Sequence, residues 1–490
     1  MIRSQILLLG FILLLSFFFR TYQVVERFEF AHDGDLYSWI VKDIVINHHP
    51  RLIGQLTSAP GIYIGPIFYY LLIPFFMITR MDPIGAALFA ILLGLTTTIS
   101  YYWVFSRIFK KGVGLIGAFL YAVLLTSVGS DRWVVPTITT SLWAVWYFYT
   151  LIMLSRGKFY IFWLLGILIG LIWHIHIALI PTLLAVPAAI FLSRKIPNFK
   201  QISIFLISLF ITSIPLILFE FKHNFIQTLS LIENFTFRQE GGPTGFYRIQ
   251  LVLGMITKNI NQLLFAPNSF NLTNNLLFTA AFLLSGILLI KTKLISFKET
   301  VSLYAWIIGP ILFFSLSSAP VSEYYFTNTN VMFIAGIALA FYYLLRRFKK
   351  EILVLALLLL IPLKNFYFLT TQNYYNKGYL EKKSVVDFIV DDARVKKFPC
   401  FSINYITSFG ENTGFRYFFY LKNAHIAVAG RGSPVYSIVI PDEYAKAEVK
   451  VKFGHIGVIT PQEIPSHELM KDACSGANTN ITDPLFGYVE

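Results

Sequence analysis

The sequence predicts an α-helical protein that crosses a membrane many times and carries a small α/β domain at its C-terminal end. Hydrophobic residues make up 56% of the 490 residues and charged residues only 13%. A soluble domain has about 45–50% apolar and about 25% charged residues. The apolar residues are also gathered into long runs, and a water-soluble fold could not bury that much apolar surface. These two observations place the chain in a membrane.

The distribution of charge supports the same conclusion. A formal net charge of +14 would point to nucleic acid in a soluble protein. Here the Lys and Arg residues form short clusters between the apolar runs, as in proteins whose orientation follows the positive-inside rule. We therefore expect membrane lipid, and no nucleic acid, among the partners. The first apolar run lacks a cleavage pattern before Arg20, so we interpret it as an uncleaved span.

A membrane-spanning helix needs about 20 predominantly apolar residues. Eleven segments are predicted as spans on this basis: 4–19, 84–105, 113–128, 138–154, 159–173, 177–192, 202–219, 275–290, 301–316, 331–345 and 352–366.

The apolar segment 66–79 is excluded from this count. At a rise of about 1.5 Å per residue it spans roughly 21 Å, less than the roughly 30 Å hydrocarbon core, and it contains Pro74. Leaving it out places the basic clusters, from Arg3 to Lys350, on one side of the membrane. We therefore expect an interfacial or re-entrant helix here, a cytoplasmic N-terminus and an extracytoplasmic C-terminal domain.

Two domains are expected, a transmembrane part (1–368) with a large first outer loop (21–83) and an extracytoplasmic α/β part (369–490). The second has short alternating runs at 401–406 and 435–440 and a helical pattern at 382–390. The two cysteines of the chain, Cys400 and Cys474, both lie in it. They could form a disulfide outside the cytoplasm, or they could be two unrelated thiols.

The segment 30–42, just beyond the first span, carries candidate catalytic groups. If a helix begins at about Asp33, this residue caps it and shares a face with Tyr37, four positions later. Asp35 supplies a second carboxylate. The alternative is a capped juxtamembrane helix whose acidic residues are only solvated.

These features resemble a known family. The acidic residues with Tyr37 after the first span, the Pro/Tyr-rich segment 65–70 that ends the first loop, and Arg132 in the second outer loop are similar to the GT-C membrane glycosyltransferases. Within them, the chain resembles glycosyltransferase family 39, the protein mannosyltransferase and aminoarabinose transferase group. The resemblance covers residues 1–220 best, and eleven spans match the mannosyltransferase layout.

The resemblance implies an enzyme that moves a hexosyl or pentosyl group from a polyprenyl-phosphate-linked donor to a hydroxyl acceptor, with inversion. The acceptor could be a lipid, a glycan or a protein. The acid of the first loop acts as base in this family, and here that acid is Asp33. The Glu that usually follows it is replaced by Gly34, with Asp35 one place later. Either carboxylate could therefore serve the acceptor.

The leaving lipid phosphate would be stabilised by positive charge at its oxygens. Arg132, in the second outer loop, is the candidate for this contact. The family's usual Asp after Pro is missing here, so Asp131 is the acid available in this loop. Alternatively, Arg132 is an interfacial anchor beside Trp133.

Five further residues are candidates for substrate contacts: Lys42, His174, His176, Glu323 and Tyr324. The two histidines border a turn between spans and would face differently, so a shared metal is not expected. Glu323 and Tyr324 belong to an aromatic-rich outer loop. The alternatives are solvated charge for Lys42, hydrogen-bonded interface histidines, and an aromatic belt.

Other functions were weighed against these residues. A transporter or flippase of lipid-linked saccharide would need charged residues along its path, and the predicted spans carry almost none. A non-catalytic glycan assembly protein shares the expected topology. No Walker or dinucleotide-binding motif and no Cys/His metal spacing is present. No cofactor is indicated with certainty, although Asp33 and Asp35 could hold a divalent cation.

Overall fold

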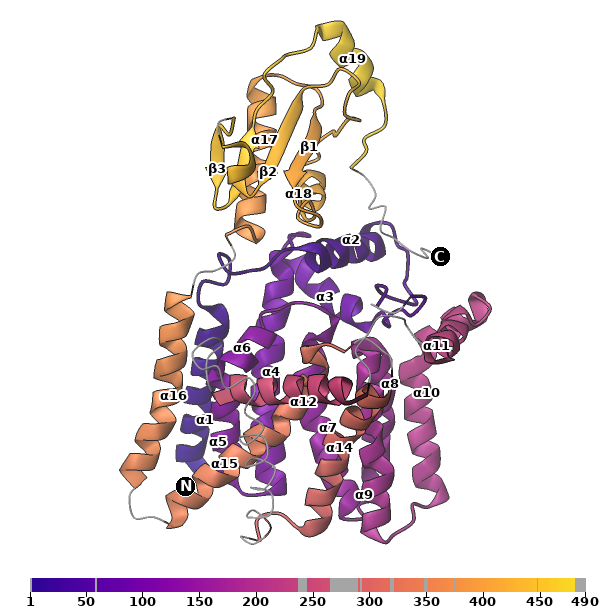
Figure 1. Cartoon of the computed structure of the whole chain (residues 1–490), viewed down its shortest axis with the longest axis vertical. Coiled ribbons are helices and arrows are strands. Elements are labelled where there is room, and N and C mark those ends of the chain that lie inside the picture. The colour runs from indigo at the N-terminus through magenta and orange to yellow at the C-terminus, as the bar shows by residue number, and fades with distance from the viewer. Residues whose placement is uncertain are drawn as a thin grey trace.

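The structure is a computed structural model that describes residues 2–57, 60–236, 245–264, 290, 293–317, 321–347, 351–372, 376–446 and 448–480. It consists of a helical body and a smaller α/β domain that sits on one end of this body (Figure 1). The N-terminus lies near the opposite end of the body, so α1 rises from that end towards the domain. The prediction of a polytopic helical protein with a C-terminal α/β domain is confirmed.

Seven segments of the described chain are long and apolar enough to cross a membrane. They contain α1 (Ile2–Thr21), α4 (Ile84–Ile108), η1 (Pro136–Thr139) with α7 (Thr140–Ser155), α10 (Phe199–Lys222), α14 (Phe297–Leu316), η5 (Glu323–Thr329) with α15 (Asn330–Arg347), and α16 (Glu351–Thr371). Each coincides with a predicted span. The predicted span 275–290 lies outside the described residues except for its last position.

The other three predicted spans coincide with shorter apolar helices, and two of them are not single α-helices. The segment 113–128 is divided into α5 (Lys111–Val123) and α6 (Leu125–Ser130), because Leu124 adopts an extended conformation. The segment 177–192 begins as a 3₁₀ helix with Pro181 inside it, η3 (Ile177–Leu184), and continues as α9 (Ala185–Ser193). Proline cannot donate to the α-helical ladder, which explains the irregular first half. The third consists of η2 (Phe159–Ile161) and α8 (Phe162–Ile175).

Two helices lie at the end of the body that carries the α/β domain: α2 (His32–Ile46) and α3 (Ile67–Ile78) (Figure 1). The expected cap at Asp33 is wrong, because α2 begins one residue earlier and its N-cap is Ala31. The segment 66–79 does form a helix, α3, whose 12 residues are too few to span a bilayer. Its interfacial position remains a prediction.

The described part of the segment between α10 and α14 contains two helices, α11 (Ile226–Thr236) and α12 (Gly245–Leu264). The buried side chains of α12 repeat every three or four residues, at Val252, Ile256, Ile260 and Leu263. This period is typical of an amphipathic helix with one face against the protein. That face packs against α14, and Arg248 donates a hydrogen bond to the carbonyl of Phe314.

The C-terminal domain is built on a four-stranded sheet of order β1-β2-β4-β3. Strands β1 and β2 are parallel, and β4 is antiparallel to both β2 and β3. Its elements are α17 (Tyr379–Val395), β1 (Ser402–Thr407), α18 (Phe415–Leu421), β2 (Val435–Ile440), η6 (Asp442–Ala445), β3 (Val451–Phe453), β4 (Ile456–Ile459) and α19 (His467–Ser475). The predicted strand 435–440 has the same bounds as β2. The predicted strand 401–406 begins and ends one residue before β1.

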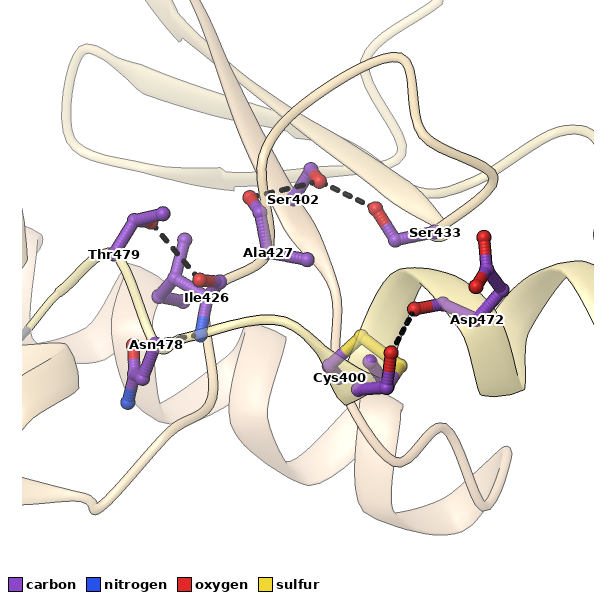
Figure 2. Close-up of a disulfide and its surroundings, with 10 residues drawn as sticks. Cys400, Ser402, Ile426, Ala427, Ser433, Asp472, Asn478 and Thr479 are labelled. Atoms are coloured by element: carbon purple, nitrogen blue, oxygen red, sulfur yellow. Dashed lines mark hydrogen bonds between the residues drawn. A yellow bond between two sulfur atoms is a disulfide. The ribbon is translucent and has the colours of Figure 1, made fainter.

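Cys400 and Cys474 form a disulfide, with their Cα atoms 5.6 Å apart (Figure 2). It joins the segment before β1 to α19. Next to it, the chain after α19 is held by Asn478, whose side chain accepts a hydrogen bond from the N–H of Ile426 at 3.1 Å. Covalent and polar contacts therefore attach the last helix to the sheet.

The domain and the helical body share one hydrophobic core. A single cluster of buried side chains includes Trp39 of α2, Phe68 of α3, Val385 of α17 and Phe418 of α18. Polar contacts surround it. Tyr379 of α17, for example, donates its hydroxyl proton to Asp82, directly before α4, at 2.7 Å. Because apolar contacts continue across the boundary, the domain is fixed on the body and not tethered by a free linker.

Replacing both Cys400 and Cys474 by serine should destabilise the C-terminal domain. The disulfide closes a separation of 74 residues, and a loop of this size corresponds to about 4 kcal/mol in the chain-entropy model. We expect faster proteolysis of the domain and a lower unfolding temperature. Quantitative alkylation of both thiols in the native protein without reductant would contradict the pairing.

Candidate functional site

The two carboxylates at the start of α2 lie on different faces of this helix. Positions two apart in an α-helix are separated by about 200° around its axis. Asp33 accepts a hydrogen bond from the side-chain amide of Gln55 in the first loop, at 3.0 Å. Asp35 is buried on the other face, where its charge acts on Lys382 and Tyr405 of the C-terminal domain. The two carboxylates thus have different surroundings, and this arrangement does not support the possible cation site that they could share.

Asp33 is positioned and yet accessible. Its side chain is 38% exposed, and Gln55 holds it from one side. The same Gln55 accepts a hydrogen bond from the hydroxyl of Tyr69 at 3.1 Å, while its backbone N–H donates to that hydroxyl at 3.0 Å. Tyr69 is fully buried in α3. These hydrogen bonds run from Tyr69 in α3 through Gln55 to Asp33. They orient the Asp33 carboxylate while leaving it accessible.

Tyr37 shares the face of Asp33, as expected, but its side chain is directed into the core. It is 1% exposed and packs edge-on against Phe68 and Phe76 of α3. Burial, and next the charge of Asp33, raises the pKa of Tyr37 well above its ordinary value. Tyr37 is therefore a neutral packing residue in this structure.

An aromatic group lies near Asp33 at the start of η5. Asp33 and Tyr324 interact electrostatically. The hydroxyl of Tyr324 lies 3.5 Å from Nε2 of His176, and its ring packs edge-on against Trp133 and His176. Tyr325 also contacts the ring of His176. The structure thus brings together three of the expected regions: the first loop, the second outer loop and the loop before α15.

His176, which contacts Tyr324 and Tyr325, is a neutral hydrogen-bond donor. Its Nδ1 accepts a hydrogen bond from the backbone N–H of Ala178 at 3.1 Å. A backbone N–H can only donate, so the proton of the neutral ring must be on Nε2, the atom that faces Tyr324. Burial lowers the pKa of His176 to about 4, so the ring is neutral at physiological pH.

His174 and Glu323 have other partners. Nε2 of His174 lies 2.8 Å from the carbonyl of Thr212 in α10, and the ring fills the space beside Gly65. The two histidines face different surroundings, as the sequence analysis expected. The side chain of Glu323 forms an ion pair with Lys258 of α12 and is half exposed.

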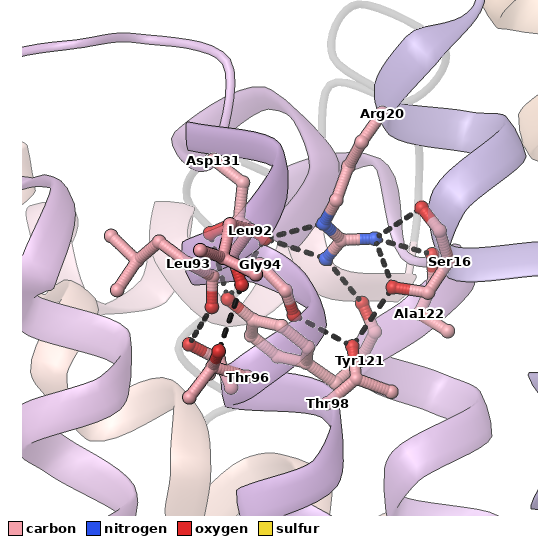
Figure 3. Close-up of polar contacts among 11 residues, drawn as sticks. Ser16, Arg20, Leu92, Leu93, Gly94, Thr96, Thr98, Tyr121, Ala122 and Asp131 are labelled. Carbon is pink, nitrogen blue, oxygen red and sulfur yellow. Dashed lines mark hydrogen bonds and ion pairs between the residues drawn. The ribbon is translucent and has the colours of Figure 1, made fainter. Parts of the chain in front are cut away.

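Asp131 belongs to a buried ion pair and not to an open site. Its carboxylate accepts hydrogen bonds from Nε and Nη2 of Arg20, at 2.8 and 2.5 Å, and from the hydroxyl of Tyr121 (Figure 3). Arg20 also donates to Ser16 and to the carbonyl of Ala122. Both charged side chains are at most 2% exposed. The geometry gives Asp131 a structural role at the C-terminal end of α1.

Arg132 contacts the first loop, and its Nη2 donates to the carbonyl of Tyr22 at 2.5 Å. Burial, together with the charges of Arg27 and Arg20, lowers the pKa of Arg132 to about 10, so it stays charged at neutral pH. The cavity beside these three arginines measures about 10 Å³, which is room for one water at most. In this structure Arg132 is bonded to the backbone of the first loop, and its contact with a lipid phosphate stays a prediction.

Lys42 lies on the face of α2 that meets the C-terminal domain. Its ammonium is 5.1 Å from the ring centre of Tyr420 and 3.4 Å from the side-chain oxygen of Asn47. Burial lowers the pKa of Lys42. The expected substrate contact would require a ligand on the other face, where Asp33 lies, so the structure does not bring Lys42 into this group.

An apolar groove of about 660 Å³ runs between α3, α4, α7 and α8. Its walls include Leu71, Leu92, Trp146 and Leu168, and His174 lies among its lining residues. This volume lies within the range of about 300–1,000 Å³ that is typical of ligand sites. Tyr70 also lines the groove, and it hydrogen-bonds through its hydroxyl to the backbone of Arg51 in the first loop. The groove therefore reaches the loop that positions Asp33.

A metal-ligand arrangement occurs elsewhere among the described residues. Asp442, Glu443 and His455 of the C-terminal domain bring their ligand atoms within 4.8 Å of one another. Asp442 is already paired with Lys452 at 2.7 Å. This group lies within the C-terminal domain and includes no residue of α2, so it is not part of the candidate site.

The comparisons with known proteins identify the fold. No protein-family model and no curated protein matches the sequence. Among solved structures, the chain is similar to ArnT from Cupriavidus metallidurans bound to undecaprenyl phosphate, with a TM-score of 0.58 and 11% identity over 95% of this chain and 98% of ArnT. It is also similar to the apo oligosaccharyltransferase of Archaeoglobus fulgidus, with a TM-score of 0.50 and 13% identity over 96% of this chain and 77% of that one.

The chain has the GT-C fold. The expected resemblance is thereby confirmed at the level of architecture, and the identities are too low to transfer residue roles. Two residues of the site, Gln55 and Arg20, were missed by the sequence analysis. A glutamine in a long loop carries no motif. Arg20 was treated as a residue that ends an apolar run, although an arginine so close to a span is a signal for a buried partner.

Removing the charge of Asp131 should destabilise the helical body. Asp131→Asn leaves Arg20 buried without a counter-charge, and breaking a buried pair from one side costs about 3–5 kcal/mol. We expect a clearly lower unfolding temperature in detergent. The matched control is Asp391→Asn, which breaks the ion pair between Asp391 and Arg394. Both side chains of this pair are about 70% exposed, and such an exposed pair contributes only about 0–1 kcal/mol to stability. Equal shifts in the two variants would contradict the structural role of Asp131.

Proposed function

We propose that the protein is an inverting glycosyltransferase that uses a polyprenyl-phosphate-linked sugar as donor, with Asp33 as the base. The observation that carries this proposal is the combination of an accessible, oriented carboxylate with an apolar groove that reaches the same loop. The GT-C fold supports it, and ArnT, a transferase of this fold, has been crystallised with undecaprenyl phosphate.

The carboxylate of Asp33 suits the acceptor step. A hydroxyl must lose its proton as its oxygen attacks the anomeric carbon, and a carboxylate within hydrogen-bond reach can take that proton. Asp33 is exposed enough to meet an acceptor, while Gln55 fixes its orientation. Attack from the side opposite the leaving phosphate inverts the anomeric configuration. Asp35 is covered by the C-terminal domain, so we assign the base to Asp33 alone.

The groove suits the donor's lipid tail. Its wall is almost entirely apolar, so it would bind isoprenoid units through the hydrophobic effect and dispersion contacts. An apolar groove offers no path for a polar saccharide, which favours a transferase over a flippase. Arg51 of the first loop contacts Tyr70 through its backbone, while its buried guanidinium is paired with Asp43 at 3.0 Å. Arg132 would anchor the first loop.

The proposed site lies on the extracytoplasmic side of the membrane. The disulfide between Cys400 and Cys474 supports this orientation, because disulfides persist outside the cytoplasm. The C-terminal domain and α2 lie at one end of the body and the N-terminus near the other (Figure 1). The N-terminus would then be cytoplasmic, as the basic clusters indicate.

The variants Asp33→Asn and Asp35→Asn test the assignment. The purified protein would be given undecaprenyl-phosphate mannose, glucose or arabinose, with membranes of the source cell as acceptor, and released undecaprenyl phosphate would be measured. General-base catalysis contributes about 10²–10⁴-fold, so Asp33→Asn should lower release by at least about 100-fold. Asp35→Asn should retain measurable activity.

Two outcomes would overturn the proposal. Full activity of Asp33→Asn would exclude Asp33 as the base. Absence of release by the wild-type protein with all three donors would count against the donor class. The anomeric configuration of an isolated product, read by nuclear magnetic resonance, tests inversion separately.

A further inference from the structure

Lys382 of the C-terminal domain is buried at the start of the helix that carries Asp33. It belongs to α17 and is 3% exposed. Its ammonium donates one hydrogen bond to the carbonyl of Phe30, in the first loop, and one to the carbonyl of Thr413, in its own domain, both at 2.8 Å. A lysine is rarely buried to this extent unless it is paired, so the position calls for an explanation.

The contact with Phe30 fixes the first turn of α2. Phe30 lies three residues before Asp33, and its ring is fully buried against Phe418 of α18, with ring centres 5.0 Å apart. Gly34 leaves space for this ring, because a Cβ there would lie 2.7 Å from Cδ2 of Phe30. The C-terminal domain thus holds the segment that precedes Asp33 through one ammonium and one ring.

The charges around Lys382 include that of Asp35 in α2. Burial lowers the pKa of Lys382 to about 8, while the charges of Asp35, Glu411 and Glu29 raise it and that of Lys377 lowers it. The pKa of Glu29 is raised, chiefly by burial, and it responds to Lys382 as well as to Asp33. The ring of Phe415 also faces the ammonium.

We propose that Lys382 is a positioning residue of the active site, through which the C-terminal domain holds the start of α2 and so the orientation of Asp33. The domain would then be required for sugar transfer itself and would not serve only to bind an acceptor. This inference rests on the proposed role of Asp33 as the base.

A matched pair of variants tests the inference in the full-length protein. Lys382→Met keeps the aliphatic length and removes the ammonium. Lys383→Met is the control, because Lys383 is the next residue of α17 and also joins the domain to the body, through Asp82 at 2.6 Å. A misplacement of about 1 Å at a reacting group can cost about 100-fold in rate, so kcat should fall at least about tenfold in Lys382→Met. We expect the donor KM, and both constants of Lys383→Met, to stay within about twofold of wild type.

The pH profile separates positioning from general stability. Wild-type kcat should fall as the pH rises through about 8, where Lys382 loses its proton and its hydrogen bonds to the carbonyls of Phe30 and Thr413 lose the strength that the positive charge gives them. This alkaline fall should be absent in Lys382→Met. In Asp35→Asn it should move to lower pH, because the carboxylate that most raises the pKa of Lys382 is gone. An unchanged alkaline limb in either variant would overturn the inference, as would equal losses of kcat in Lys382→Met and Lys383→Met.

Hydrogen–deuterium exchange gives a readout that needs no activity. Peptides that cover residues 29–37 should exchange faster in Lys382→Met than in Lys383→Met and wild type. Equal exchange in all three proteins would overturn the inference. If the wild-type protein transfers none of the three sugars, the proposed function fails, while the exchange data still decide whether Lys382 holds this segment. If Lys382→Met does not fold, Asp35→Asn and its pH profile decide.

Discussion

The burial of α2 on two opposite faces is the constraint on which the site depends. One face packs on α3 through Tyr37, and the other packs on the C-terminal domain through Trp39, whose ring lies 5.3 Å from that of Tyr417. A juxtamembrane helix with one apolar face would lie on the membrane surface. Here both faces of α2 are covered, so its rotation about its own axis is fixed. This rotation directs Asp33 towards Gln55 and Asp35 towards Lys382.

The helical body could largely be predicted from the sequence because the bilayer imposes a simple rule on length and composition. Every predicted span in the described part of the chain coincides with an apolar helix. The misjudged features are local. Nothing in the composition of 113–128 shows that Leu124 leaves the helix, and the cap of α2 depends on a backbone conformation at Ala31. Tertiary packing determines both.

The site was harder to predict, because its residues meet through contacts between distant segments. Arg20 and Asp131 are separated by 111 positions, and Lys382 meets Phe30 across 352 positions. Charge clustering in the sequence assigned Asp131 to an outer loop but could not show that its carboxylate is occupied. Residue type and membrane side are readable from a sequence, whereas the availability of a side chain for a ligand is decided by its partners in the fold.

The glycine that follows Asp33 has a structural reason. A side chain at this position would meet the ring of Phe30, which the C-terminal domain holds in place. The next acid of the helix is Asp35, which lies on the covered face of α2 beside Lys382. A carboxylate buried beside an ammonium is suited to hold structure and poorly suited to reach an acceptor hydroxyl. The base proposed for this chain is consequently a single carboxylate, Asp33, whereas Asp35 contributes to the contact between α2 and the C-terminal domain.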